Sequence, residues 1–360
     1  MFLRKTNRNI IEYYYPMWHR VSFTIIAEYH INELRKYFYV VTIDELSFRY
    51  RDIYSNNIRI LHPFFFIAMR DPKYLLKIAD KSRALIAIDV ADTDRLGNLA
   101  VNLANVTSCC IVPSSFCKEV FEISGVKVPV YVVPHGLSEL WYQHNLPIQH
   151  QLIRKLYEIK RNRNYIYLLY ILMHSGFRKG ANQVYEVYKE ISKMYPNVKL
   201  VVKFGSLSGY DFERLSQLTE YYFCEYLTER ELVTLYDICD VYLLFSIGGG
   251  FEHCGLQAIS RGLVTLASDI GSWTDYLPQF CLIPHDRPVK VFSDQDCETG
   301  IHCGYGYPVN VEKAIDKLKD VIENLDDYKA RVREYWNKIG HQFKWSAIGL
   351  KLKQIIERYM

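Results

Sequence analysis

The sequence predicts an α/β protein made of two successive units, each built on a parallel β-sheet. Two observations carry this prediction: the chain is long, and short apolar runs with high strand propensity alternate along it with segments of helical periodicity. A length of 360 residues suffices for two domains that each bury a hydrophobic core. Strands that alternate with helices are typical of parallel sheets joined by helical crossovers, as in Rossmann-like domains.

The first half of the chain contains six strand candidates. They cover residues 10–15, 38–43, 58–61, 84–88, 109–112 and 130–133. An amphipathic stretch at 21–37 predicts a helix between the first two strands. Pro72 suits the first turn of the next helix, and Ser114 or Ser115 suits the cap of a later one. We assign residues 1–140 to the first domain.

The second half restarts the same alternation and is assigned to a second domain, residues 141–339. Its strand candidates are 165–172, 199–204, 221–226, 240–245 and 264–267. A basic run at 154–163 follows the domain boundary, and such a run is more typical of a solvated helix face than of a binding patch. The end of the chain, 336–360, predicts one or two amphipathic helices.

Composition limits the classes of partner. Hydrophobic residues make up 49% of the chain, so we expect it to fold throughout. Lys and Arg total 44 against 40 Asp and Glu, a balance without the general positive field that attracts nucleic acid. The nine cysteines lack zinc spacing, the first residues lack the continuous apolar region of a secretory signal, and no apolar stretch reaches spanning length. We expect a cytoplasmic protein with no transmembrane segment, while peripheral membrane contact stays open.

A glycine-rich segment stands between two strand candidates at residues 245–269, FSIGGGFEHCGLQAISRGLVTLASD. Gly248, Gly249 and Gly250 allow a ligand to approach the backbone closely, and the helix that follows offers free N–H groups and partial positive charge. This arrangement suits a phosphate. The run is not G-x-G-x-x-G, and a plain tight turn accounts for it about equally well.

A second glycine-flanked loop, His174 to Gly180, follows the strand candidate 165–172. Ligands of open α/β sheets bind at the carboxyl ends of the strands. Arg178 and Lys179 are therefore placed to neutralise a diphosphate without a metal. The alternative is an exposed basic turn.

Taken in order, several segments resemble the donor domain of the family 4 glycosyltransferases. The segments are RKGANQVYEVYKEI, VKLVVKFG, LTERELVTLYDICDVYLLFS and GGGFEHCGLQAISRGLVTLASDIG, with fainter matches at DTDR, VPSSFCKEVFEISGV and VYVVPHG. The resemblance covers roughly residues 84–310. It implies the B-type glycosyltransferase fold, in which two Rossmann-like domains face each other across a cleft and a C-terminal helix, here 340–360, packs back on the first domain.

For the donor side, the resemblance implies that Lys179 holds the diphosphate, with Arg178 as its companion and a catalytic contribution from Lys179. It implies that the nucleotide base lies near two turns. These turns contain Tyr226, Leu227 and Thr228, and Gly205 with Ser206. The glycine-rich unit with Phe251 completes the expected donor site.

The family's paired glutamates, with seven residues between them, fall here on Gly249 and Gln257. Gln257 can still accept a hydrogen bond from a ribose hydroxyl, but Gly249 offers no side chain. Glu252 lies three residues after Gly249. It either supplies a displaced catalytic carboxylate that faces the sugar or complements the start of its helix, two readings of equal standing.

The first half should supply the acceptor side. Aromatic residues after the first strand, Tyr14, Tyr15 and Trp18 with His19 beside them, either stack on a sugar or belong to the core. Three further groups follow strand ends and are expected at the acceptor: Asp92 or Asp94 as catalytic carboxylates that orient a hydroxyl, together with Arg95 and His135.

The resemblance implies a hexosyltransferase-type enzyme that moves a sugar from a UDP- or GDP-linked donor to a glycan, lipid or protein acceptor, with retention and without a cofactor or metal. A non-catalytic nucleotide-sugar or glycan-binding protein is the alternative, and a sugar-nucleotide epimerase or phosphorylase is another. The abundance of tyrosine, 30 residues, resembles proteins of hyperthermophilic archaea and their viruses.

Overall fold

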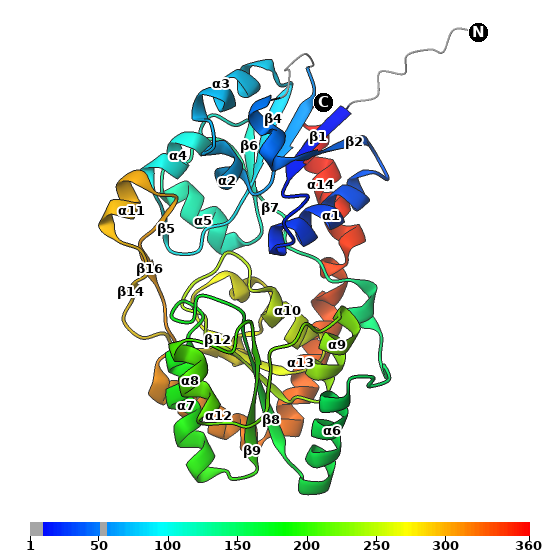
Figure 1. The fold of residues 1–360 in the computed structure, drawn as a ribbon, viewed down its shortest axis with the longest axis vertical. Helices are drawn as coiled ribbons and strands as arrows, with labels where there is room; N and C mark the ends of the chain where they lie inside the picture. Colours follow the sequence, from blue (N-terminus) through cyan, green and yellow to red (C-terminus); the bar gives the residue numbers. More distant parts are fainter. Residues whose placement is uncertain (1–9, 51–55) are drawn as a thin grey trace, which may run out of the picture. The chain divides into compact units, whose positions relative to one another are not determined.

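The computed structural model describes residues 10–50 and 56–360, and the chain divides into two compact units (Figure 1). Unit 1 comprises Met1–Gly136, Phe292–Gly304 and Gln342–Met360, and unit 2 comprises Leu137–Val291 and Tyr305–His341. Each unit contains a six-stranded sheet in which all neighbouring strands are parallel. The predicted α/β class with two Rossmann-like units is therefore confirmed.

The sheet of unit 1 has the strand order β2-β1-β3-β4-β6-β7. The strands are β1 Ile10–Tyr15, β2 Tyr39–Asp44, β3 Ile58–Leu61, β4 Ala84–Ile88, β6 Cys109–Val112 and β7 Val130–Val132. All six agree with the predicted strands to within one residue at each end, because each is a short run rich in apolar or aromatic residues.

Helices cover both faces of this sheet, and β1 shows how its residues divide between them. Tyr13 belongs to the core shared with α1 and α14, whereas Tyr14 belongs to the core on the opposite face. The helices of unit 1 are α1 Ser22–Leu34, α2 Phe64–Ala68, α3 Pro72–Lys81, α4 Asn98–Ala104, α5 Ser115–Ile123 and α14 Trp345–Glu357. As predicted, Pro72 opens α3, and the Ser114 hydroxyl caps α5 by accepting a hydrogen bond from the Cys117 N–H.

The end of the chain returns to unit 1, where α14 lies beside α1 (red and blue in Figure 1). The Tyr29 and Trp345 rings stack with centroids 4.5 Å apart. Gly349 allows the close approach, because a Cβ there would lie 2.6 Å from the Glu33 Cβ. Of the two C-terminal helices, α14 belongs to unit 1 and α13, Leu325–Ile339, to unit 2.

A segment that was predicted to belong to the second domain, Phe292–Gly304, packs in unit 1 instead. Its strand β15, His302–Cys303, pairs antiparallel with β5, Arg95–Leu96. The Gly97 N–H donates to the Ile301 carbonyl, and a Cβ on Gly97 would overlap the Gly300 carbonyl. The segment also contains α11, Asp294–Thr299. It is held by close backbone contacts, and these leave no hydrophobic periodicity in the sequence from which they could be predicted.

Unit 2 has the strand order β10-β9-β8-β11-β12-β13. Its strands are β8 Ile166–Leu172, β9 Val198–Phe204, β10 Tyr222–Phe223, β11 Val241–Leu244, β12 Val264–Ser268 and β13 Leu282–Ile283. Its helices are α6 Gln151–Arg163, α7 Ala181–Met194, α8 Tyr210–Ser216, α9 Glu229–Asp237, α10 His253–Ser260, α12 Val311–Glu323 and α13, and a small antiparallel pair is formed by β14 Val289–Lys290 and β16 Tyr305–Gly306. The strand predicted at 221–226 is reduced to β10, because only two of its residues pair with β9.

The strand order of unit 2 reverses between β8 and β11. From β8 the chain proceeds to β9 and β10 on one side, and from β11 to β12 and β13 on the other. Ligands of open α/β sheets bind at such a reversal, beyond the carboxyl ends of the strands. In unit 2 this place lies at the loop after β8 and the loop after β11, and in unit 1 it lies after β1 and β3.

Candidate functional site

The loops that follow β8 and β11 pack against each other through their backbones. The Ile247 N–H donates to the Arg178 carbonyl at 2.8 Å. Gly180 has a φ of 76°, and a Cβ there would overlap the Phe245 carbonyl. Glycine is required at position 180 both for its left-handed backbone and for this close approach. The two glycine-flanked loops singled out in the sequence therefore form one site.

Side chains connect the same two loops. The Arg178 guanidinium donates to the Gly248 carbonyl at 3.0 Å, and Lys179 Nζ lies 2.6 Å from Glu252 Oε1. The Lys179 side chain is 21% exposed and that of Glu252 only 7%, so this ion pair is largely withdrawn from solvent. The exposed basic turn considered for Arg178 and Lys179 does not fit these contacts.

The Glu252 carboxylate lies beside Gly249. A Cβ built on Gly249 would overlap Glu252 Oε1 and would lie 3.5 Å from an Arg178 guanidinium nitrogen. The carboxylate therefore occupies the space into which a side chain at position 249 would project. Glu252 stands at the N-cap of α10, but its side chain makes no capping hydrogen bond.

Gln257 is buried on α10, and its amide oxygen faces Tyr236. The Tyr236 hydroxyl lies 3.3 Å from that oxygen and 3.2 Å from the Cys254 carbonyl, so its one proton serves two acceptors. The amide oxygen of Gln257 thus has a contact within the protein. Its predicted bond to a ribose stays a prediction.

The two turns expected near a nucleotide base lie after β9 and before α9. Thr228 caps α9, with its hydroxyl accepting from the Glu231 N–H, while Leu227 is buried and Tyr226 is 80% exposed. The Gly205 N–H donates to the Leu172 carbonyl, and the Ser206 hydroxyl bonds a neighbouring serine. A cavity of about 160 Å³ lies beside this second turn and extends to the loop after β8.

The predicted acceptor-side residues have different environments in unit 1. Tyr14 and Tyr15 are core residues, whereas Trp18 is 83% exposed and His19 is also exposed. The core reading therefore holds for the two tyrosines, and contact with a sugar stays a prediction for Trp18 and His19. Asp92 and Asp94 are half-buried, and Arg95 is exposed on β5. Asp94 lies against Gly304, where a Cβ would overlap its carboxylate.

Sequence reasoning missed a buried polar cluster at the carboxyl ends of β3, β4 and β7. A small cavity in unit 1 is lined by His30, His62, Asp89 and the predicted His135. The Tyr13 hydroxyl lies 3.1 Å from His30 Nδ1 and 2.9 Å from His62 Nδ1, so it donates to one imidazole and accepts from the other. Burial lowers the pKa of His30 to about 3 and that of His62 well below its usual range, so both are neutral at pH 7.

Asp89 is the acidic member of this cluster. Its carboxylate accepts hydrogen bonds from the backbone N–H groups of Phe65 and Val90, at 2.7 and 2.8 Å. Burial nevertheless raises the pKa of Asp89 to about 7. Asp89 and His62 each directly follow a predicted strand, a signal that could have identified them, whereas His30 lies on a helix and carries no such signal.

The described residues, 10–50 and 56–360, contain no group of three or more His, Cys, Asp or Glu side chains arranged to hold a metal ion. They also contain no helix long and apolar enough to cross a membrane.

No protein-family model matches the chain, but two viral proteins are similar to it in sequence. Uncharacterized protein 356 of Sulfolobus islandicus rod-shaped virus 1 is 32% identical over 359 residues, which cover 97% of this chain and 98% of that protein. Putative glycosyltransferase 45 of Sulfolobus islandicus filamentous virus (isolate Iceland/Hveragerdi) is 24% identical over 279 residues, 73% of each chain.

Solved structures share the fold at low sequence identity. An E. coli trehalose-6-phosphate structure bound with UDP-2-fluoro glucose has a TM-score of 0.66 and 10% identity, covering 97% of this chain and 98% of that one. The pneumococcal O-GlcNAc transferase GtfA, in complex with UDP and GlcNAc, has a TM-score of 0.58 and 14% identity over 85% of this chain and 57% of its own. This similarity confirms the B-type glycosyltransferase fold.

Proposed function

The chain belongs to the same family as Uncharacterized protein 356 of Sulfolobus islandicus rod-shaped virus 1, and we propose that it is a glycosyltransferase that uses a nucleotide-sugar donor. One observation carries the proposal. At the strand-order reversal of unit 2, Arg178, Lys179 and Glu252 gather around Gly248 and Gly249. Both sequence relatives come from viruses of Sulfolobus, which supports an archaeal viral origin for this chain as well.

Donor binding is assigned to the two basic side chains. An ammonium group has three N–H donors, so the pairing of Lys179 with Glu252 leaves two for diphosphate oxygens. Transfer breaks the bond between the anomeric carbon and the phosphate oxygen, and negative charge develops on the departing diphosphate. Arg178 and Lys179 would stabilise this charge in place of a metal ion. Because the structural neighbours were solved with UDP or a UDP-sugar, UDP is the first nucleotide to test, followed by GDP.

We assign Glu252 the role of the carboxylate that Gly249 lacks, facing the transferred sugar. Its carboxylate lies where a side chain at 249 would begin, and it makes no capping bond to the helix. The first domain would supply the acceptor side through Asp92, Asp94, Arg95, Trp18, His19 and His135. We add Asp89 and His62 to these candidates, because they line the same small cavity as His135. Retention is proposed from the family resemblance: an acceptor hydroxyl attacks from the side of the leaving group, whose phosphate oxygen takes the proton.

The test is to incubate the purified protein with UDP- and GDP-linked hexoses and to follow nucleoside diphosphate release and sugar transfer by mass spectrometry. Release or transfer that persists in excess EDTA is the expected result. Loss of turnover on chelation with recovery on adding manganese would overturn metal independence. Binding without either hydrolysis or transfer would identify a non-catalytic nucleotide-sugar binding protein instead.

A further inference from the structure

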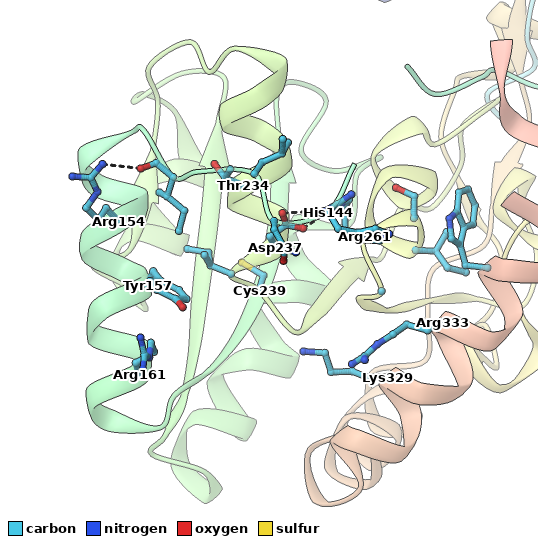
Figure 2. Close-up of a pocket in the computed structure, with 18 of the residues that line it drawn as sticks. His144, Arg154, Tyr157, Arg161, Thr234, Asp237, Cys239, Arg261, Lys329 and Arg333 are labelled. Atoms are coloured by element: carbon cyan, nitrogen blue, oxygen red, sulfur yellow. Dashed lines mark hydrogen bonds and ion pairs between the residues drawn. The ribbon is translucent and has the colours of Figure 1, made fainter. Parts of the chain in front are cut away.

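A large cavity lies in unit 2 between α6 and α13 (Figure 2). Its volume is about 1010 Å³. Arg154, Tyr157 and Arg161 line it from α6, at spacings of three and four residues that put them on one helix face. Lys329 and Arg333 reach toward α6 from one face of α13. We call this space the α6–α13 cavity.

The α6–α13 cavity is separate from the candidate donor site. Ile238 and Cys239, which line it, lie shortly before β11, so it lies at the amino ends of the strands. The loops that carry Lys179 and Glu252 follow the carboxyl ends of β8 and β11, at the opposite edge of the same sheet.

Two cations of the cavity lining have a structural role, because they form ion pairs with neighbouring carboxylates. Arg261 binds both carboxylate oxygens of Asp237, at 2.7 and 3.0 Å, and also donates to the carbonyls of Trp141 and Gln143. Lys329 lies 2.8 Å from Asp240, which also pairs with Lys160. Asp237 therefore neutralises Arg261, whereas Lys329 shares the single Asp240 carboxylate with Lys160.

The remaining cations of the lining are not compensated in this way. Within residues 10–50 and 56–360, neither Arg161 nor Arg333 forms an ion pair, and Arg154 donates to the Ile148 carbonyl. Glu158 is the one acidic side chain of the lining besides Asp237, among the described residues. Three guanidinium groups against one carboxylate leave the cavity with an excess of positive charge.

We propose that the α6–α13 cavity binds a phosphate-bearing small molecule of nucleotide size. Small-molecule sites usually enclose about 300–1,000 Å³, so this cavity has room for a ligand larger than a single phosphate. Planar guanidinium groups on two facing helices match the oxygens of a phosphoanhydride. Tyr157 is 39% exposed, with the Arg161 guanidinium 5.8 Å from its ring centroid, and it supplies an aromatic ring on which a base would stack. The basic run 154–163, expected to be a solvated helix face, thus forms one wall of a site.

The test measures binding by calorimetry in an Arg178→Ala, Lys179→Ala background, so that the proposed donor site does not contribute. Inorganic pyrophosphate and ADP are the probes. Adding Arg161→Gln and Arg333→Gln should weaken the binding of both probes by at least about tenfold, because each substitution removes a charge-assisted hydrogen bond while keeping polar length. Adding Tyr157→Ala separates the two sources of phosphate, since it should weaken ADP only if a base stacks there.

The matched control is Lys155→Gln with Lys338→Gln. Both lysines are exposed on the same two helices and lie outside the cavity lining, so the control removes the same charge. The expected result is a loss of affinity confined to the Arg161 and Arg333 variant. The proposal is overturned if the background variant binds neither probe, or if the control weakens binding as much as the test substitutions do. These outcomes do not depend on transferase activity, because only binding is measured.

Discussion

Lys179 Nζ lies 2.6 Å from Glu252 Oε1, and the carboxylate of this pair fills the space into which a side chain at position 249 would extend. The glycine and the glutamate therefore depend on each other. A residue with a Cβ at 249 would displace the carboxylate, and Glu252 could not reach its present place beside Arg178 and Lys179. In this chain the carboxylate comes from the helix start rather than from the glycine loop.

Gly249→Ala should disrupt the Lys179–Glu252 pair, because the new methyl group would overlap the carboxylate oxygen. We expect nucleoside-diphosphate affinity and transfer rate to fall by about tenfold or more, the equivalent of about 1.4 kcal/mol. Binding is measured by calorimetry and transfer with the donor identified in the nucleotide-sugar screen.

A double-mutant cycle tests this steric explanation. In a Glu252→Ala background the space beside Gly249 is empty, so the added Gly249→Ala should have little further effect. Additive effects of the two substitutions would contradict a direct contact between the positions.

Lys179→Ala should weaken nucleoside-diphosphate binding by about ten-fold to a hundred-fold, the value of a charge-assisted hydrogen bond of about 1.5–3 kcal/mol. The variant also leaves the buried Glu252 carboxylate without its cation, which lowers stability. The double variant Lys179→Ala, Glu252→Gln removes that second effect. Lys193→Ala, an exposed position on the following helix, serves as the control.

If Lys179 contacts the diphosphate, the double variant regains stability while its affinity stays low. Recovery of affinity together with stability would show that Lys179 acts only through the fold of the loop.

The strand pattern predicted most of the fold, and the reasons for its failures are local. The six strands of unit 1 are short runs rich in apolar or aromatic residues, so the sequence pattern identifies them to within one residue. Segment 292–304 was predicted to belong to the second domain but packs in unit 1. The sequence pattern does not reveal this, because the backbone contact of Gly97 with Gly300 and the β5–β15 pairing leave no hydrophobic pattern.

The candidate site likewise has one part that the sequence could predict and one part that it could not. The convergence of Arg178 and Lys179 with Gly248 could be expected, since both loops follow strands at the ligand-binding edge. The Tyr13–His30–His62 cluster could not, because it joins a strand, a helix and a second strand end through contacts between side chains distant in sequence.

Glu252→Gln distinguishes the two readings of this residue. A glutamate that only complements the helix start would give a small loss of stability, about 0.3–1 kcal/mol, with little kinetic effect. We expect instead that the transfer rate falls by about tenfold, because the neutral amide binds a sugar hydroxyl less strongly than a carboxylate does. Nucleoside-diphosphate affinity should not fall, since Lys179 keeps its charge and the competing acceptor changes from a carboxylate to a weaker, neutral amide oxygen.

The measurement pairs melting temperature and nucleoside-diphosphate affinity with the transfer rate. A rate reduced by less than about three-fold, under roughly 1 kcal/mol of barrier, would make Glu252 a structural residue and refute its role as the replacement carboxylate.

Asp89→Asn should change how stability depends on pH. Burial raises the pKa of Asp89 from 3.8 to about 7, so between these values the folded chain keeps a proton that the unfolded chain releases. This contribution to stability is complete below about pH 4 and is lost as the pH rises to about 7. At about 1.4 kcal/mol per pKa unit, the loss approaches roughly 4 kcal/mol. The asparagine variant does not titrate and lacks this loss.

The change with pH, rather than the stability at one pH, is the quantity to measure. Asparagine cannot accept both backbone N–H bonds that Asp89 accepts from Phe65 and Val90, and this lowers the stability of the variant by the same amount at every pH. Free energies of unfolding are measured in guanidinium chloride at pH 4, 5.5 and 7. As the pH rises, the stability of the variant relative to that of the wild type should increase. The control is Asp80→Asn, because the Asp80 side chain lies in the same unit and is 77% exposed. Its free energy of unfolding should change with pH in parallel with that of the wild type. Parallel curves for Asp89→Asn as well would mean that the buried carboxyl is ionised throughout this range.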